Sequence, residues 1–225
     1  MNQLLSLLTL FSLLFLVSHL TAYFWRSIFR GKKYSLIVFP GVVIHELSHL
    51  LACILTLAKV KEVKLFSFKG GYVRHQKPKI PIIGVPLISF FPVIGGALAL
   101  IFIYKVIGFN LPQFSLSISF IRSFQSVFVA NWQNYIFWIA IYLSISIIMS
   151  ITPSKKDMRN SLFALLILFV LITILIEMGV VQSLNFLNPI INVIAFSLTV
   201  GIFTMLFSGL IYLIKSGFVK VMSKL

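Results

Sequence analysis

The stretch that decides the fold is IVFPGVVIHELSHLLACILTL, residues 37–57, which has the length and hydrophobicity of a membrane-spanning helix. Its middle nevertheless carries His45, Glu46, Ser48 and His49. Ionisable side chains are costly inside a bilayer and usually mark a functional site there. Residues four apart lie on one face of a helix, so we expect the two histidine rings to lie one above the other. The pattern predicts that this helix binds a metal ion.

The composition of the whole chain is that of a membrane protein. Of 225 residues, 60% are hydrophobic and 10% are charged, and the mean hydropathy is +1.07. A soluble core of this size does not bury so much apolar surface. Apolar runs of spanning length lie at residues 3–25, 34–58, 80–107, 134–153, 161–182 and 189–215. We therefore expect an all-α polytopic membrane protein with about six transmembrane helices, forming a single domain over residues 1–225.

The positive charge of the chain points to lipid rather than to nucleic acid. The net charge is +15, but the Lys and Arg residues lie in short connections between the apolar runs. This distribution is typical of proteins that face an anionic bilayer, so we expect the lipid bilayer as a partner and no nucleic acid. The connections after the second and fourth runs, with the C-terminal tail, hold more basic residues than the connections after the first and third. The positive-inside rule therefore favours cytoplasmic N- and C-termini.

A β-hairpin is predicted between the second and third helices, in KVKEVKLFSFKGGYVRHQKPK, residues 59–79. Residues 60–68 are rich in β-branched and aromatic side chains, and Gly70-Gly71 signals a two-residue turn. The third helix that follows is expected to be kinked or broken by its prolines and glycines, which are Pro81, Gly84, Pro86, Pro92, Gly95 and Gly96.

The metal predicted from residues 45–49 is zinc. His45-Glu46-Leu47-Ser48-His49 is an HExxH pattern, in which two histidines bind Zn²⁺ and Glu46 is the general base toward a zinc-activated water. Catalytic zinc usually has three protein ligands. Cys53 lies eight residues from His45, about 12 Å along a helix, which is too far to share one ion, so we expect a packed free thiol.

Asp157 is the candidate third ligand because the chain has only four acidic residues. Glu62 lies among lysines and is expected to form an ion pair, while Glu177 falls on the opposite side of the predicted topology. The same topology places Asp157 on the side of the hairpin. A second interpretation stays open, since Ser154 and Asp157 have the spacing of a capping box at the start of the fifth helix.

Three features in order resemble the site-2 protease family of intramembrane zinc metalloproteases, over residues 34–160. HELSH lies inside a helix, a glycine-containing hairpin follows, and SITPSKKD then places an aspartate after a proline-containing turn. The resemblance implies zinc bound by His45, His49 and Asp157, with Glu46 as the base. The late motif differs from the family pattern, since its second proline is missing and Met158 replaces a glycine. Without a PDZ-like insertion, the chain is similar to a compact prokaryotic member.

The function implied is hydrolysis of peptide bonds in membrane-embedded or membrane-proximal protein substrates, by a multi-pass protein of a prokaryotic cell membrane. The hairpin would hold the substrate as an added strand, which makes Gly70, Gly71 and Tyr72 candidate substrate-binding residues. The alternative is a catalytically silent zinc-binding scaffold that binds membrane-protein clients, against which the intact Glu46 argues. A transporter is disfavoured because the fourth and sixth apolar runs lack ionisable side chains before their ends.

Overall fold

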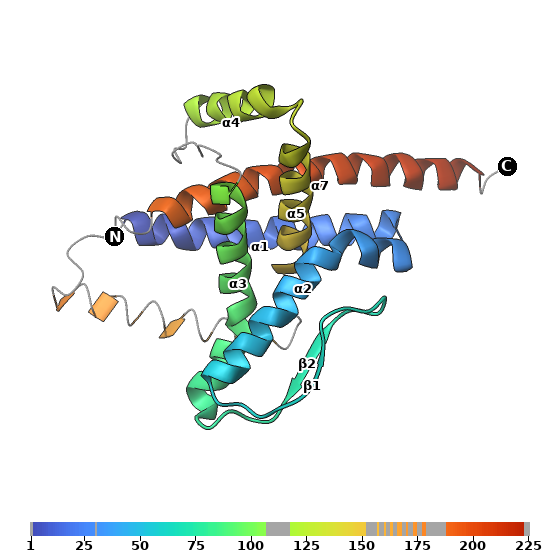
Figure 1. Cartoon of the computed structure of the whole chain (residues 1–225). Helices are drawn as coiled ribbons and strands as arrows, with labels where there is room; N and C mark the ends of the chain where they lie inside the picture. Colours follow the sequence, from blue (N-terminus) through green and yellow to red (C-terminus); the bar gives the residue numbers. More distant parts are fainter. Residues whose placement is uncertain are drawn as a thin grey trace.

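The computed structural model describes residues 2–29, 31–106, 118–151, 157, 160, 163, 166–167, 170, 173–174, 177–178 and 188–222 (Figure 1). These residues form helices and one small antiparallel sheet. The elements are α1 (Asn2–Ile28), α2 (Lys32–Leu55), β1 (Val60–Lys64), β2 (Tyr72–His75), α3 (Pro81–Val106), α4 (Ile118–Asn131), α5 (Tyr135–Ile151) and α7 (Asn188–Met222).

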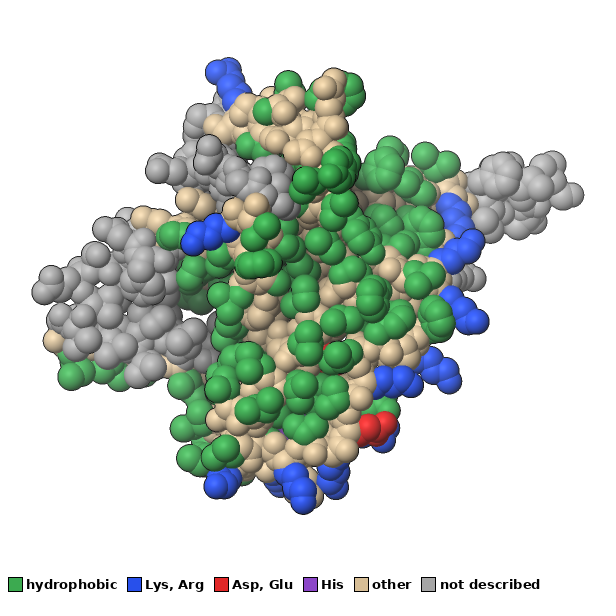
Figure 2. Space-filling model, in the orientation of Figure 1, with side chains coloured by type: hydrophobic (Ala, Val, Ile, Leu, Met, Phe, Trp, Pro, Cys, Tyr) green, Lys and Arg blue, Asp and Glu red, His purple; other side chains and the backbone are tan. Residues whose placement is uncertain are grey.

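Four helices in the described part of the chain are long and apolar enough to cross a membrane, namely α1, α2, α3 and α7. They match the first, second, third and sixth predicted runs. The run at 134–153 forms α5, an apolar helix of 17 residues. The run at 161–182 lies mostly outside the described residues, so the count of six helices stays a prediction. Figure 2 shows hydrophobic side chains covering the middle of one face, with Lys and Arg at its margins, as expected of a membrane protein.

The helices α1 and α7 lie side by side and run in the same direction (Figure 1). Val17 lies against Gly201, and further along both helices the Lys215 ammonium donates a hydrogen bond of 3.3 Å to the Ser27 carbonyl. Two parallel helices that both cross a bilayer end on the same face. The predicted cytoplasmic position of both termini does not follow from this arrangement and stays a prediction. That prediction rested on six alternating crossings, one of which falls on residues 161–182.

The helix α2 packs between α3 and α5 through small residues. The Gly41 amide donates a hydrogen bond of 2.9 Å to Ser146 Oγ on α5, and a Cβ added to Gly41 would overlap the Ser146 carbonyl. On the other side, a Cβ at Gly95 of α3 would overlap Ser48 Oγ. Backbones approach this closely only where a side chain is missing, as is common between membrane helices. The contacts hold the HExxH segment at the centre of the bundle.

The main hydrophobic core lies between α1, α3, α5 and α7. Its side chains that are 2% exposed or less are Leu14, Leu100, Tyr104, Phe137, Ile147, Ile148, Ile194, Ala195 and Phe196. On α2, by contrast, the outward side chains Leu47, Leu51 and Ile54 are 43%, 51% and 59% exposed. An apolar stripe of this kind is suited to contact with lipid.

The predicted hairpin is confirmed, but its turn is longer than predicted. The strands pair antiparallel from Val63 with Val73 to Lys64 with Tyr72, so residues 65–71 form a seven-residue loop. Gly70 has φ 106°, a conformation that favours glycine. The two-residue turn was wrong because Phe66 and Phe68, read as strand residues, pack on α2 instead of pairing with β2.

The hairpin folds back along α2 so that its loop reaches the first turns of that helix (Figure 1). Ser35 Oγ donates a hydrogen bond of 2.8 Å to the Phe68 carbonyl, and the rings of Phe39 and Phe66 have centroids 4.7 Å apart. The loop therefore lies where α1 ends, while β2 lines one cavity together with Asp157. That the hairpin and Asp157 share one side of the membrane stays a prediction.

Candidate metal centre

The two histidines of the HExxH segment form a pair on the inner face of α2. The ring centroids of His45 and His49 are 4.9 Å apart and the rings are nearly perpendicular, at 77°. Both side chains lie one turn apart on an uninterrupted helix, as the spacing predicted.

His49 is oriented by a carbonyl that proline leaves free. Its Nδ1 lies 2.9 Å from the Ile88 carbonyl of α3. In a regular helix that carbonyl would accept a hydrogen bond from the amide four residues on, but residue 92 is proline and has no N–H. A carbonyl only accepts, so Nδ1 donates and Nε2 keeps its lone pair for a metal. Pro92 does not break α3, which continues through it as one helix. Its effect is to leave the Ile88 carbonyl free for His49.

His45 lacks the corresponding partner. Its Nδ1 is buried without a hydrogen bond in the described part of the chain, although the backbone of Ser150 lies nearby. Ser150 Oγ on α5 is likewise buried and without a partner there. A metal-bound histidine usually donates from its second nitrogen to a carbonyl, a carboxylate or water. These unpaired atoms are therefore suited to an additional ligand or water beside His45.

A cavity of about 510 Å³ brings the predicted site residues together. We call it the histidine cavity, and it is lined by His45, Glu46, His49 and Asp157 together with side chains of β2 and α3. Asp157 is half-buried and accepts a hydrogen bond of 3.3 Å from Ser89 Oγ on α3. Its charge is close enough to act on His45, Glu46 and His49. Asp157 therefore lines the same cavity as the two histidines and Glu46.

The described side chains do not by themselves form a three-ligand metal site. Among the described residues, no group of three or more His, Cys, Asp or Glu side chains is close enough together to hold a metal ion. The capping interpretation rests on Ser154, which lies outside the described residues. The donor set still fits zinc in two respects, since His49 has a free Nε2 and His45 a buried nitrogen without a partner. The assignment of Asp157 stays a prediction.

Glu46 is buried on α2 beneath Gly71 of the hairpin. It is 8% exposed, and a Cβ added to Gly71 would lie 2.5 Å from its Cγ and 2.7 Å from the Leu65 carbonyl. Only a residue without a side chain leaves Glu46 this space. Gly71 therefore lies against the predicted base, and its role in substrate binding stays a prediction.

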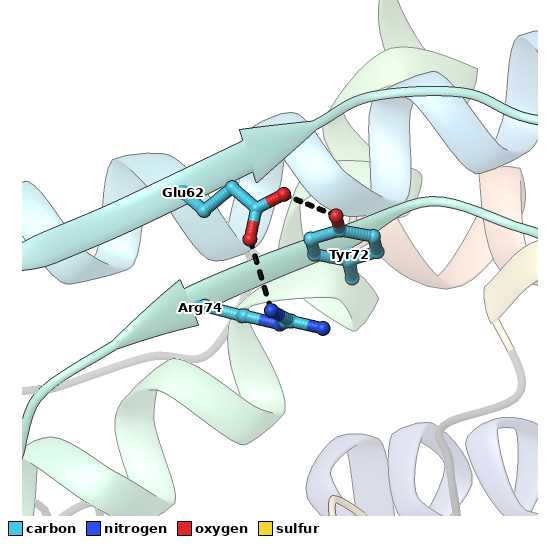
Figure 3. Close-up of polar contacts among 3 residues, drawn as sticks. All are labelled: Glu62, Tyr72 and Arg74. Atoms are coloured by element: carbon cyan, nitrogen blue, oxygen red, sulfur yellow. Dashed lines mark hydrogen bonds and ion pairs between the residues drawn. The ribbon is translucent and has the colours of Figure 1, made fainter.

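The outer surface of the hairpin carries a small polar network (Figure 3). Arg74 Nη1 donates to Glu62 Oε2 at 3.0 Å, and the Tyr72 hydroxyl donates to Glu62 Oε1. The predicted ion pair of Glu62 is thereby confirmed. The hydrogen bond to Glu62 raises the pKa of Tyr72 above its usual value. Tyr72 also borders the histidine cavity, while Gly70 does not.

Several residues at the site were not found from the sequence. Ser89 bridges Asp157 and Asn160, whose Nδ2 donates to Ser89 Oγ at 3.3 Å. Asn160 follows Asp157 by three residues, which is one helical turn, and this spacing was a usable signal. His75 also lines the histidine cavity. Cys53 is fully buried beside Ala52, Ala58 and Ile88, which confirms that it is a packed thiol.

No family model matches the chain, and neither the curated proteins nor the solved structures contain a match. The resemblance to site-2 proteases therefore rests on the sequence motifs alone and stays a prediction.

Proposed function

We propose that the protein is an intramembrane zinc metalloprotease of the site-2 protease type. The observation that carries the proposal is the histidine cavity, where His45, Glu46, His49 and Asp157 meet at the centre of an apolar helix bundle. Ionisable groups gathered inside such a bundle are functional in most cases. The four residues include the donor types of a catalytic zinc site and a carboxylate next to it.

His45 and His49 would hold the zinc, and Asp157 would complete the protein ligands. When bound, zinc polarises a substrate carbonyl and makes water a better nucleophile near neutral pH. Glu46 accepts the proton that water loses as its oxygen attacks the carbonyl carbon. Glu46 then delivers a proton to the leaving nitrogen as the C–N bond breaks, so that a carboxylate and an amine are the products.

The hairpin supplies a place for an extended substrate. Each strand of a two-stranded sheet has an unpaired edge, and Val73 of β2 lies in the wall of the histidine cavity. A substrate segment that pairs with this edge would be extended, which peptide-bond hydrolysis requires of a membrane helix. Proline at alternate positions of the strand edge is expected to reduce cleavage. Unchanged cleavage in these variants would exclude strand pairing.

We further propose that the histidine cavity opens toward the cytoplasm of a prokaryotic cell. The support is the charge of the segment around the strands, where Lys59, Lys61, Lys64, Arg74, Lys77 and Lys79 outnumber a single glutamate. Substrates are then membrane-embedded proteins or segments close to the membrane. The lipid bilayer supplies the remaining contacts of the apolar surface.

The test is Glu46→Gln in the purified, zinc-loaded full chain. Cleavage of model transmembrane proteins in vesicles, followed by mass spectrometry, is expected to fall by at least about 100-fold when the base is lost. Zinc content is expected to stay unchanged. The matched control is Glu177→Gln, which changes an exposed glutamate outside both cavities and keeps full activity.

The competing proposal, a silent zinc-binding scaffold, gives a different result in the same experiment. Client binding by a scaffold would not depend on the Glu46 carboxylate, and the wild type would not cleave. Equal activity of wild type and Glu46→Gln would exclude the protease proposal.

A further inference from the structure

A second cavity reaches the predicted catalytic residues from the other direction. It has a volume of about 440 Å³ and shares His45, Glu46 and Gly71 with the histidine cavity. We call it the basic cavity. It extends along the first half of α2, between the end of α1, the end of α5 and the hairpin loop, and its polar lining includes Arg26, Tyr34, Ser35, Ser67, Lys69 and Ser150. The two cavities therefore meet at Glu46 and open toward opposite ends of α2.

The outer end of the basic cavity carries positive charge without acidic partners. Arg26 and Lys69 line it, and within the described residues neither forms an ion pair. The Arg26 guanidinium lies 5.3 Å from the centroid of the Tyr34 ring. Stacking on a ring orients the planar guanidinium and leaves its N–H groups free at the edge, where a carboxylate can accept them. The rim is therefore suited to an anionic group.

The inner end carries hydrogen-bonding atoms that lack partners. His45 Nδ1 and Ser150 Oγ are both buried and unpaired within the described residues, and both residues line this cavity. Buried polar atoms are almost always hydrogen-bonded in native structures. An occupant that is polar along its length, such as a peptide backbone with its water, can form hydrogen bonds with both atoms. The acyl chains of a lipid would leave both atoms unpaired.

We propose, on the basis of the protease function above, that the basic cavity binds the substrate on one side of the cleaved bond and selects an acidic side chain there. Arg26 and Lys69 are the specificity-determining residues. Glu46 is the only acidic residue that the structure places in the lining, so a substrate carboxylate is attracted to the rim and not to the inner end.

The length of the cavity sets where this acidic residue lies. Tyr34 precedes Glu46 by twelve residues, which corresponds to about 18 Å along a helix. An extended chain advances about 3.3 Å per residue, so the distance is covered by about five substrate residues. The acidic side chain is therefore expected about five residues from the cleaved bond.

The experiment measures binding separately from cleavage. The full chain with Glu46→Gln is placed in phosphatidylcholine vesicles with a labelled apolar model peptide that carries one Glu about five residues from its centre, or Gln at the same place. The Glu peptide is expected to bind about fivefold more tightly, as for partly exposed ion pairs. The double variant Arg26→Gln/Lys69→Gln removes this preference. The control Lys33→Gln/Lys79→Gln, which removes the same charge outside both cavities, keeps it.

Three results would overturn the inference: equal or absent binding of both peptides, a preference that survives the Arg26 and Lys69 changes, or loss of the preference in vesicles containing phosphatidylglycerol. The last result would mean that the cavity binds lipid phosphate. Because the binding assay needs no turnover, charge-selective binding without any cleavage by the wild type would reject the protease and keep the site. Cleavage without any preference for the Glu peptide would keep the protease proposal and reject the site for an acidic side chain.

Discussion

Replacement of Pro92 by alanine is expected to weaken zinc binding without a direct change to any ligand. In the structure the Ile88 carbonyl accepts from His49 Nδ1 at 2.9 Å because residue 92 offers no N–H. Alanine supplies that N–H in the position of the regular helical hydrogen bond. The carbonyl is then shared between the helix and His49, and the ring is held less firmly with Nε2 toward the metal.

The size of the effect follows from this one hydrogen bond. A hydrogen bond from an imidazole polarised by a metal is worth about 1.5–3 kcal/mol, and about 1.4 kcal/mol corresponds to a factor of ten. A carbonyl has two lone pairs, so His49 keeps part of the interaction. We therefore expect zinc affinity to fall about tenfold, at the lower end of the range for partners of metal ligands. The helix gains a backbone hydrogen bond and loses some buried proline surface, so the melting temperature is expected to change little.

The assay is competition for zinc between the purified chain and a fluorescent chelator. The matched control is Pro86→Ala, in the same helix, which restores a hydrogen bond to the carbonyl of Ile82. The Ile82 side chain is 73% exposed and no histidine contacts its carbonyl in the described residues. Equal zinc affinity of Pro92→Ala and the wild type, with both folded, would refute the role assigned to the freed carbonyl.

Three further changes test other contacts. Gly71→Ala places a Cβ 2.5 Å from Glu46 Cγ, so we expect a loss of about 1–3 kcal/mol in unfolding free energy and at least about tenfold slower cleavage; normal cleavage would show that Glu46 has room to move. Gly41→Ala forces α2 away from a backbone carbonyl of α5 and is expected to cost about 3 kcal/mol, measured by thermal unfolding in detergent; an unchanged melting curve would contradict the close packing. Glu62→Ala removes the acceptor that raises the pKa of Tyr72, so tyrosinate absorbance should appear at lower pH than in the wild type, and an identical titration would exclude the hydrogen bond.

Local patterns in the sequence predicted the elements of the fold and the first part of the site. Hydrophobic runs predicted the four long helices. Each segment that crosses a bilayer must be apolar and must satisfy its own backbone hydrogen bonds, so the helix is visible in that segment alone. The helical repeat is also a property of a single segment, and it placed His45 and His49 one turn apart on one face. The ion pair of Glu62 and the burial of Cys53 were also accessible from their immediate neighbours.

Features that depend on how segments pack were not predicted. The parallel direction of α1 and α7 depends on a connection between them that hydrophobic runs alone do not specify. The path of the hairpin along α2 is fixed by contacts such as Ser35 with Phe68, which join residues 33 positions apart. The sequence alone does not identify Ser89 as a hydrogen-bond partner of Asp157, because the contact depends on how α3 packs against Asp157. The pairing of Pro92 with His49 needed both helices, although the missing N–H was visible in the sequence.

The most direct measurement is the zinc content of the detergent-purified full chain, prepared without chelator, for the wild type beside His49→Ala and Asp157→Ala. A catalytic site with two histidines and Asp157 predicts about one zinc per wild-type chain, almost none in His49→Ala and a clearly reduced amount in Asp157→Ala. An equal zinc content in wild type and Asp157→Ala would remove Asp157 from the site. A wild type without bound zinc would contradict the proposed metalloprotease.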